Sequence, residues 1–473
     1  MNIQRKKDNM RLPTFLLTFI LILTACAAPA KDLPTEPLIK TEPTIATFEN
    51  SLLAVEWTGR SKGNLLFPLD PITGTALPGY APIALGQSYF YAFSPDRSTL
   101  AAVTFPNENT YSGSLLLIDI PGWKAQTVEL ETVGWVSAMV FSPDGNKLAI
   151  AQGELNYQLT IFDLEQGVIT AHTKTDFLIS RLKFTANSNS LMIYGMSMQN
   201  RFTENEMNGS PPQVRLLDAA DLSPLWSVDL KSVRDGIYPT DEKVTPDLSE
   251  PGTAMYLSPA TLFAPKQNIL YIVHADSEQL TTVDFDSRKV ETIEIHTELS
   301  WFERLLSITA SVAHAKVADG TGKQAAISPD GQFLYVVGIR SESVQRKNGN
   351  WDMNQIPLGL EIIRSKDGSR LERLETDSAE LSLSPNGHYL YLRHWEDQYT
   401  VPWTEIFDTS SREIVARKAD VHASPALRIN GEPLLVSTYS LAENSHHMGI
   451  FQPDDLQVLT EWTGPDYVAW LTP

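Results

Sequence analysis

The side chains that could take part in chemistry are few and are spread along the chain. Of the nine histidines, only His446 and His447 are adjacent. Neighbouring side chains of an extended segment point to opposite sides, so an exposed loop pair explains them better than a metal site. The segment 394–397 (HWED) joins a histidine, a tryptophan and two carboxylates. A general acid–base site could be built from this group, although such clusters are usually solvated loop.

Motifs that identify whole classes of enzyme do not occur in the sequence. There is no Gly-x-Ser-x-Gly turn, no His-Glu-x-x-His motif, no phosphate-binding glycine loop and no calcium-loop spacing. Cys26 is the single cysteine, which excludes an internal disulfide and cysteine-based zinc, iron–sulfur and c-type haem sites. We therefore expect no metal and no cofactor.

The chain is acidic, with a net charge of −20 over 473 residues. The part after Cys26 holds 33 basic and 56 acidic residues, a net charge of −23. A surface of this sign repels phosphate backbones, so we expect no nucleic-acid partner. The same charge favours solubility, and we expect a monomer.

The first 26 residues have the pattern of an export signal. Four basic residues accompany the apolar run Leu12–Leu23, which is too short to span a bilayer stably. Leu23-Thr24-Ala25-Cys26 follows and resembles the bacterial lipobox. That resemblance implies a lipid on Cys26, cleavage before it, and anchoring to the cell envelope: the outer membrane if the cell has one, otherwise the outer face of the cell membrane. Residues 27–44 contain four prolines and predict an extended tether.

Residues 45–473 repeat one phrase: an apolar strand, a Ser-Pro-Asp-Gly-like turn and a second apolar strand. Proline fixes φ at the first turn position, and glycine accepts the left-handed conformation that closes the hairpin. A second apolar hairpin follows each copy, and four strands per repeat make one blade of a β-propeller. The clear copies are Tyr91–Val103, Met139–Ala151, Ala325–Val337 and Glu380–Leu392, and the weaker ones are Leu182–Tyr194, Thr261–Val273 and Pro425–Val436.

The spacing and the two ends of the chain predict a closed ring. Turn positions 143 to 186 and 385 to 429 are 43 and 44 residues apart, which matches the period of WD repeats. The region resembles the WD40-like and YVTN-type propellers of bacterial envelope proteins, without the recurring Gly-His and Trp-Asp pairs of eukaryotic WD repeats. The first unit starts at Leu52 with a second-strand sequence, and Asp466–Pro473 resembles a first strand. We expect an all-β, single propeller of eight four-stranded blades (alternatively seven), closed by the C-terminal strand joining the first blade. A β-sandwich or a two-domain all-β protein remains the other possibility.

The long insertions segregate to one face of the predicted propeller. They lie between second and third strands or between blades, at 104–113, 196–213, 231–252, 297–323, 340–358, 394–403 and 438–447. Loops on one face of a rigid scaffold are the usual place for binding residues. Aromatic, basic and histidine side chains of these loops are the candidate contacts: Tyr111, Arg201, Tyr238, Arg340, Trp351, His394, Trp395, Tyr399, Trp403 and His446.

Two functions fit this pattern. The first is a membrane-anchored binding or scaffold propeller that recognises a protein, peptide or glycan through the loop-rich face. The alternative is a propeller enzyme of the lactonase, lyase or glycosidase type, whose residues are scattered on inner strands and leave no local motif. Two carboxylates and a histidine gathered at the channel mouth would favour the enzyme, and an aromatic rim without them would favour binding.

Overall fold

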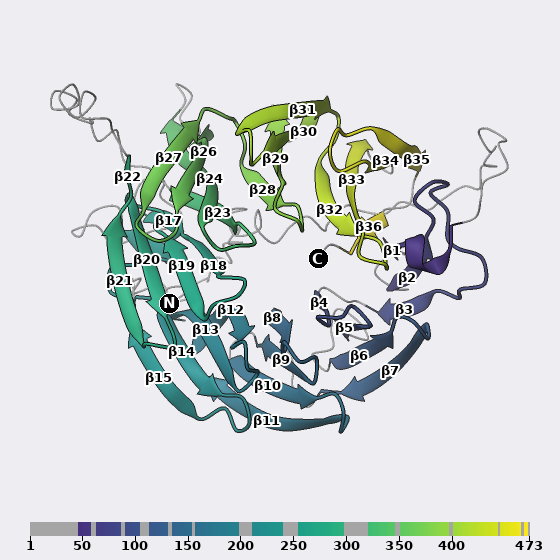
Figure 1. Ribbon diagram of the computed structural model, residues 1–473, viewed down its shortest axis with the longest axis horizontal. Helices are drawn as coiled ribbons and strands as arrows, with labels where there is room; N and C mark the ends of the chain where they lie inside the picture. Colours follow the sequence, from purple (N-terminus) through teal and green to yellow (C-terminus); the bar gives the residue numbers. More distant parts are fainter. Residues whose placement is uncertain are drawn as a thin grey trace, which may run out of the picture.

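The computed structural model describes residues 46–57, 63–86, 90–104, 113–130, 135–153, 157–197, 211–239, 254–297, 320–345, 351–396, 401–442, 445–464 and 468–471. Within these ranges, the one helical element is a single turn, η2 (Phe48–Asn50). The strands form sheets arranged around a central axis (Figure 1). The protein is an all-β, single β-propeller, as the repeat predicts.

Seven of the sheets are four-stranded antiparallel blades, each named here by its innermost strand. From the innermost to the outermost strand, they are β36 (Val468–Trp470), β1 (Leu52–Trp57), β2 (Asn64–Leu69) and β3 (Ile83–Gly86); β4 (Phe90–Phe93), β5 (Thr99–Thr104), β6 (Ser114–Asp119) and β7 (Lys124–Glu129); β8 (Val136–Phe141), β9 (Lys147–Gln152), β10 (Tyr157–Asp163) and β11 (Val168–Thr175); β12 (Phe177–Phe184), β13 (Ser190–Ser197), β14 (Gln213–Asp218) and β15 (Pro224–Asp229); β18 (Ala260–Phe263), β19 (Ile269–Val273), β20 (Gln279–Asp284) and β21 (Lys289–Glu294); β28 (Glu380–Leu383), β29 (Tyr389–Glu396), β30 (Val401–Asp408) and β31 (Glu413–Ala419); and β32 (Ala423–Leu427), β33 (Pro433–Ala442), β34 (Ser445–Phe451) and β35 (Val458–Gly464).

Between the β18 and β28 blades stands a larger sheet of eight strands. Its antiparallel centre is β23 (Gly320–Ile327), β24 (Phe333–Gln345), β26 (Leu360–Arg364) and β27 (Ser369–Leu374). The other four strands are β25 (Trp351–Pro357) on the end of β24, β22 (His296–Thr297) parallel to β27, β17 (Ala254–Ser258) parallel to β23, and β16 (Gly236–Pro239) on β17.

The prediction of eight four-stranded blades is therefore wrong. The described ring has seven four-stranded blades, and the remaining sheet is twice that size. The additional strands come from insertions between blades and from a lengthened hairpin. Their backbone groups find hydrogen-bond partners along the edges of β23, β24 and β27.

The Ser-Pro-Asp turns set the hairpins locally. The Ser142 hydroxyl donates to Asp144 Oδ1 at 2.6 Å, and the Lys147 amide donates to the Ser142 hydroxyl at 2.9 Å. Gly145 adopts φ 75°, the left-handed region that closes the turn. Turns of this kind keep the connections between first and second strands short, so this face of the ring carries little elaboration.

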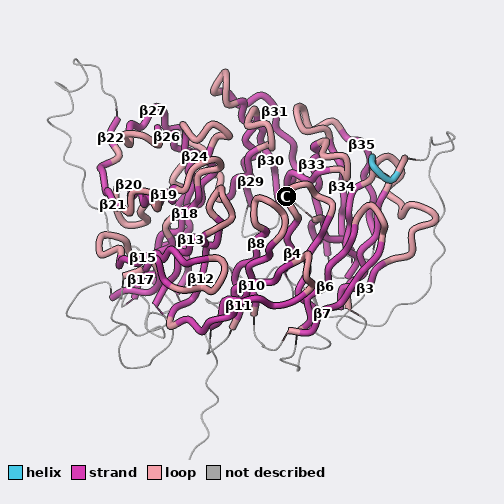
Figure 2. Tube along the Cα trace, turned by 60° about the horizontal axis from the view of Figure 1, so that its bottom comes forward, coloured by secondary structure: helices cyan, strands magenta, loops and turns pink. Residues whose placement is uncertain are grey.

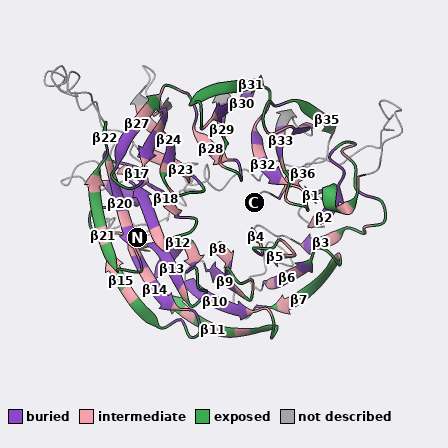
Figure 3. Cartoon of the chain, in the orientation of Figure 1, coloured by how far each residue is buried: buried purple, intermediate pink, exposed green. Residues whose placement is uncertain are grey.

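The hydrophobic core lies in the seams between neighbouring sheets. Each seam is filled by residues from two sheets, as in the cluster that joins Leu159 and Ile161 of the β8 blade to Phe184 and Leu191 of the β12 blade. Figure 3 shows the result: the middle strands are largely buried, whereas outer strands such as β11 and β31 are largely exposed. Burial of these seams is the main force that holds the sheets around the axis.

The two chain ends close the ring in the predicted way. β36 pairs with β1, with Ala54 opposite Trp470 and Glu56 opposite Val468. The prediction that the C-terminal strand joins the first blade as its innermost strand is confirmed. A second connection lies at the other end of β1, where the Asn430 amide donates to the Glu49 carbonyl at 2.8 Å.

Three of the predicted insertions are lengthened hairpins. The segments 340–358, 394–403 and 438–447 extend the pairs β24–β25, β29–β30 and β33–β34 beyond the body of their sheets. They belong to consecutive sheets of the ring, and Figure 2 shows their strands running from one face to the other. We call the end of the ring that carries these hairpins and the connections between blades the loop-rich face.

Candidate functional site

Two inner strands bring charged side chains to the loop-rich face near the axis. Glu380 is the first residue of β28, and His422 directly precedes β32. Arg393 lies opposite Glu380 in the pairing of β28 with β29. The Ser378 hydroxyl donates to the Glu380 carbonyl at 2.9 Å and fixes the entry into β28. The hairpin register and the seam between the β28 and β32 blades together place the three side chains in one cluster.

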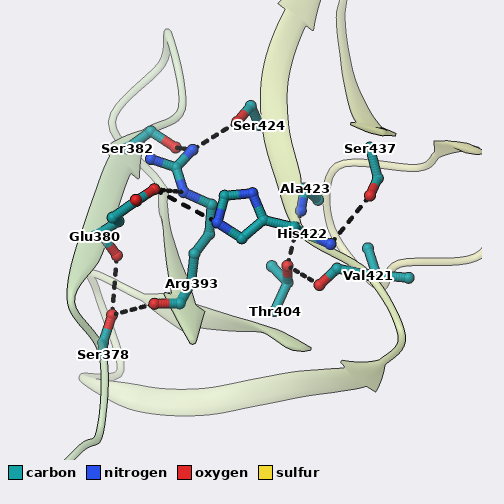
Figure 4. Close-up of polar contacts among 10 residues, drawn as sticks. All are labelled: Ser378, Glu380, Ser382, Arg393, Thr404, Val421, His422, Ala423, Ser424 and Ser437. Atoms are coloured by element: carbon teal, nitrogen blue, oxygen red, sulfur yellow. Dashed lines mark hydrogen bonds and ion pairs between the residues drawn. The ribbon is translucent and has the colours of Figure 1, made fainter. Parts of the chain in front are cut away.

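Arg393 is the centre of this cluster (Figure 4). Its Nε lies 3.2 Å from Glu380 Oε2, and His422 Nε2 lies 3.4 Å from the same oxygen. Its Nη1 donates to Ser424 Oγ at 2.6 Å and lies 3.5 Å from Ser382 Oγ. Ser382 and Ser424 belong to different blades, so the guanidinium joins the two sheets. We call these five residues the Glu380 cluster.

Two hydroxyls hold the backbone at His422. Thr404 Oγ1 donates to the Val421 carbonyl at 2.8 Å and accepts from the Ala423 amide at 2.9 Å. Ser437 Oγ accepts from the His422 amide at 3.0 Å. The connection into β32 is thus fixed on both sides, so the imidazole has little freedom to leave the cluster (Figure 4).

Burial and mutual contact set the charges of the cluster. Burial raises the pKa of Glu380, but the contacts with His422 and Arg393 outweigh it and hold the pKa below its ordinary value. Burial lowers the pKa of Arg393, which the Glu380 carboxylate partly offsets. Burial also lowers the pKa of His422. At neutral pH the cluster is one carboxylate, one guanidinium and one neutral imidazole, with no net charge.

The cluster keeps two polar atoms for further contacts. In the part of the chain that the structure describes, neither Glu380 Oε1 nor Arg393 Nη2 makes a hydrogen bond. The side chain of Glu380 is 31% exposed, so its carboxylate reaches solvent. An acceptor and a donor therefore remain for a ligand. The cluster holds a single carboxylate, not the two that would favour a propeller enzyme.

A second polar group lies on the other side of the β28 blade. His394 Nε2 lies 3.0 Å from Glu405 Oε2, and the His394 ring lies against Trp403 with centroids 5.0 Å apart. Arg417 covers Trp403 at 4.5 Å and has its Nε 3.7 Å from Glu405 Oε1. Burial raises the pKa of Glu405, but His394 and Arg417 outweigh it and hold the pKa below its ordinary value. His394 and Trp403 are thus close together, in a stack of which His394 is the buried member and Arg417 the exposed one.

The other predicted contact residues are dispersed over the loop-rich face. Tyr238 is buried on β16, Arg340 on β24 lies 3.1 Å from Glu342, and His446 is buried on β34. Trp351 and Trp395 lie on β25 and β29, but their side chains fall outside the described part. Four further predicted residues also lie outside the described residues: Cys26, Tyr111, Arg201 and Tyr399.

Sequence reasoning missed Glu380, Arg393 and His422. A signal for the first two was present, since Glu380 and Arg393 stand at equal distances from the Pro385–His388 turn, and a hairpin pairs such positions. His422 carried no such signal, because its position beside Glu380 depends on the packing of one blade on the next.

Exposed aromatic rings occupy the loop-rich ends of inner strands elsewhere in the ring. Phe90 begins β4 and is 37% exposed, and Trp135 directly precedes β8 and is 55% exposed. Figure 1 shows β8 across the axis from β28. Two exposed aromatic rings therefore lie across the axis from the blade that carries the Glu380 cluster.

Within the described ranges, no helix is long and apolar enough to cross a membrane. Among the same residues, no group of three or more histidine, cysteine or acidic side chains is arranged to hold a metal ion.

Several solved structures are similar to this chain at low sequence identity. Dihydro-heme d1 dehydrogenase NirN, in complex with DHE, is 12% identical with a TM-score of 0.52, over 92% of this chain and 77% of that chain. A protein from Lactobacillus plantarum is 14% identical (TM-score 0.43, 78% and 96% coverage), and the Cps50 (Swd1) β-propeller domain of Myceliophteria thermophila is 11% identical (0.41, 75% and 93%). The likeness to NirN concerns the propeller fold alone. No protein-family model and no curated protein matches the sequence.

Proposed function

We propose that this protein is an exported propeller, anchored to the cell envelope by a lipid on Cys26, that binds a ligand over the axis of its loop-rich face. The observation that carries the proposal is the Glu380 cluster. Within the residues that the structure describes, its Glu380 Oε1 and Arg393 Nη2 atoms make no hydrogen bond. Binding sites combine apolar contact area with a few placed polar groups. Phe90 and Trp135 add such area across the axis.

Binding accounts for the cluster better than catalysis does. A propeller hydrolase of the kind considered above needs a second carboxylate beside the first, and Glu405 lies with His394 in the stack on the other side of the blade. Arg393 is committed to holding two blades together through Ser382 and Ser424. A rigid, internally neutral group of this kind orients a bound molecule, and at neutral pH its carboxylate and neutral imidazole offer no general acid beside the base.

The proposal is tested by comparing Glu380→Gln with Glu432→Gln. Glu432 pairs with Arg428 at 2.8 Å in the turn between β32 and β33, at the opposite end of that blade, so it is a matched control. The full chain is immobilised in detergent and incubated with an envelope extract. We expect a component that wild type and Glu432→Gln retain and that Glu380→Gln loses by about tenfold or more. Equal retention by all three proteins would refute the proposal.

A further inference from the structure

The ligand that suits the Glu380 cluster is neutral. The negative charge of Glu380 is already matched by Arg393 at 3.2 Å, and the imidazole of His422 at 3.4 Å is uncharged at neutral pH. A charged ligand group would have to be desolvated beside this pair without gaining a free counter-charge. An anionic ligand would also meet the negative field of a chain with net charge −20. Binding here therefore depends on hydrogen bonds to neutral polar groups.

The two atoms without partners define the hydrogen bonds. Glu380 Oε1 can only accept, and Arg393 Nη2 can only donate. A hydroxyl group does both at once, so two neighbouring hydroxyls on one ring serve this acceptor and this donor in more than one orientation. Ser382 and Ser424 add hydroxyl oxygens beside the guanidinium. An amide would match the same two atoms in one orientation only.

The exposed rings of Trp135 and Phe90 suit the apolar faces of a sugar ring. A pyranose ring presents apolar C–H groups on its faces and hydroxyls on its rim. Trp135, 55% exposed before β8, and Phe90, 37% exposed at the start of β4, offer aromatic surface across the axis from β28 (Figure 1). Aromatic rings of this kind supply contact area at a low cost in side-chain entropy.

We propose that the Glu380 cluster binds adjacent hydroxyls of a neutral glycan, whose neighbouring units lie against Trp135 and Phe90. This inference rests on the proposed function and narrows it to one class of ligand. Glu380 accepts from one hydroxyl and Arg393 donates to its neighbour. Removing the charge of Glu380 weakens the first bond, because hydrogen bonds to charged groups are the stronger ones, and removing the guanidinium of Arg393 loses the second.

The test uses an array that carries neutral glycans, uronic-acid and sialylated glycans, and peptides of different charge. The full chain in detergent is applied as wild type, Glu380→Gln, Arg393→Lys and the control Glu432→Gln, after thermal melting shows that each is folded. Arg393→Lys keeps the positive charge but loses the planar fork that reaches both a ligand and Ser424. We expect wild type and Glu432→Gln to bind neutral glycans, and Glu380→Gln and Arg393→Lys to bind them at least about tenfold more weakly.

The other outcomes separate this inference from the proposed function. If the protein binds only charged glycans or peptides, and Glu380→Gln weakens that binding, the assignment of a neutral glycan is wrong and the proposed binding site is supported. Binding of any ligand with equal strength by all four proteins would overturn both. An array on which no neutral glycan is bound by wild type would overturn the inference as well.

Discussion

Leu471→Ala tests whether the C-terminal strand holds the ring closed. Leu471 is 5% exposed and packs beside Leu53 and Val55 of β1, and its amide donates to the Leu53 carbonyl at 3.3 Å. Truncating a buried leucine to alanine costs about 2–5 kcal/mol. The lost contacts lie between β36 and the rest of the ring, and the connection of Asn430 to Glu49 stays intact. We therefore expect local release of β36 and not loss of the whole fold.

Hydrogen exchange read by mass spectrometry measures this release. A destabilisation of about 2–5 kcal/mol corresponds to roughly 30-fold to several-thousand-fold faster exchange of the amides in 468–471 and of their partners in β1. Leu456→Ala is the matched control, because Leu456 is 4% exposed in the neighbouring β32 blade and touches neither β36 nor β1. Equal exchange of 468–471 in both variants, or uniform acceleration over all blades in Leu471→Ala, would refute the reasoning.

Three further predictions concern packing, pH and the closure. Gly195→Ala should lower the free energy of unfolding by about 1–3 kcal/mol in urea denaturation, because a Cβ there would lie 2.1 Å from the ring of Phe177. Gly322→Ala is the control: its added Cβ would meet no atom within 4 Å, so its free energy of unfolding should stay within about 0.5 kcal/mol of wild type. Burial lowers the pKa of His422 below 6.5, so the unfolded chain gains a proton that the folded chain does not as pH falls through that value. The free energy of unfolding of wild type should therefore fall more steeply from pH 7 to pH 5 than that of His422→Gln, and equal slopes in urea titrations would contradict this. Thr438→Val removes two hydrogen bonds of 2.8 Å to β36 and should lower the melting temperature, with a loss of about 1–3 kcal/mol.

The parts of the fold that local turn chemistry determines could be predicted from the sequence. Each Ser-Pro-Asp phrase is a hairpin, as Ser142 and Asp144 show, and the second-strand sequence at Leu52 indicated correctly that its inner neighbour comes from the other end of the chain. The enlarged sheet could not be predicted in this way. Its β17 pairs in parallel with β23, a segment more than sixty residues later, and such a pairing depends on where the ring places the two segments.

In the candidate site, too, the contacts within one hairpin could be predicted better than the contacts between blades. Of the predicted contact residues whose side chains the structure describes, His394 and Trp403 come together, with their rings in direct contact. His394 also contacts Glu405, which the sequence did not single out. The Glu380 cluster depends on a seam between blades. Sequence patterns report what one hairpin does, and they do not report which side chains of the next blade face it.

The position of the Glu380 cluster argues that its role lies outside stability. The seam between the β28 and β32 blades is already filled by buried residues such as Tyr391, Leu435 and Phe451. Replacing a buried ion pair by well-packed apolar residues is often neutral or stabilising, so an aliphatic seam along its full length would hold the blades at least as well. The seam between the β8 and β12 blades is filled in this way by aliphatic and aromatic side chains. A second ion pair, Lys418 with Glu461 at 3.8 Å, joins the outer strands of the two blades. The charges of Glu380 and Arg393 stand where the seam reaches the loop-rich face near the axis, and there a bound molecule can use a carboxylate oxygen and a guanidinium nitrogen that make no hydrogen bond within the described residues.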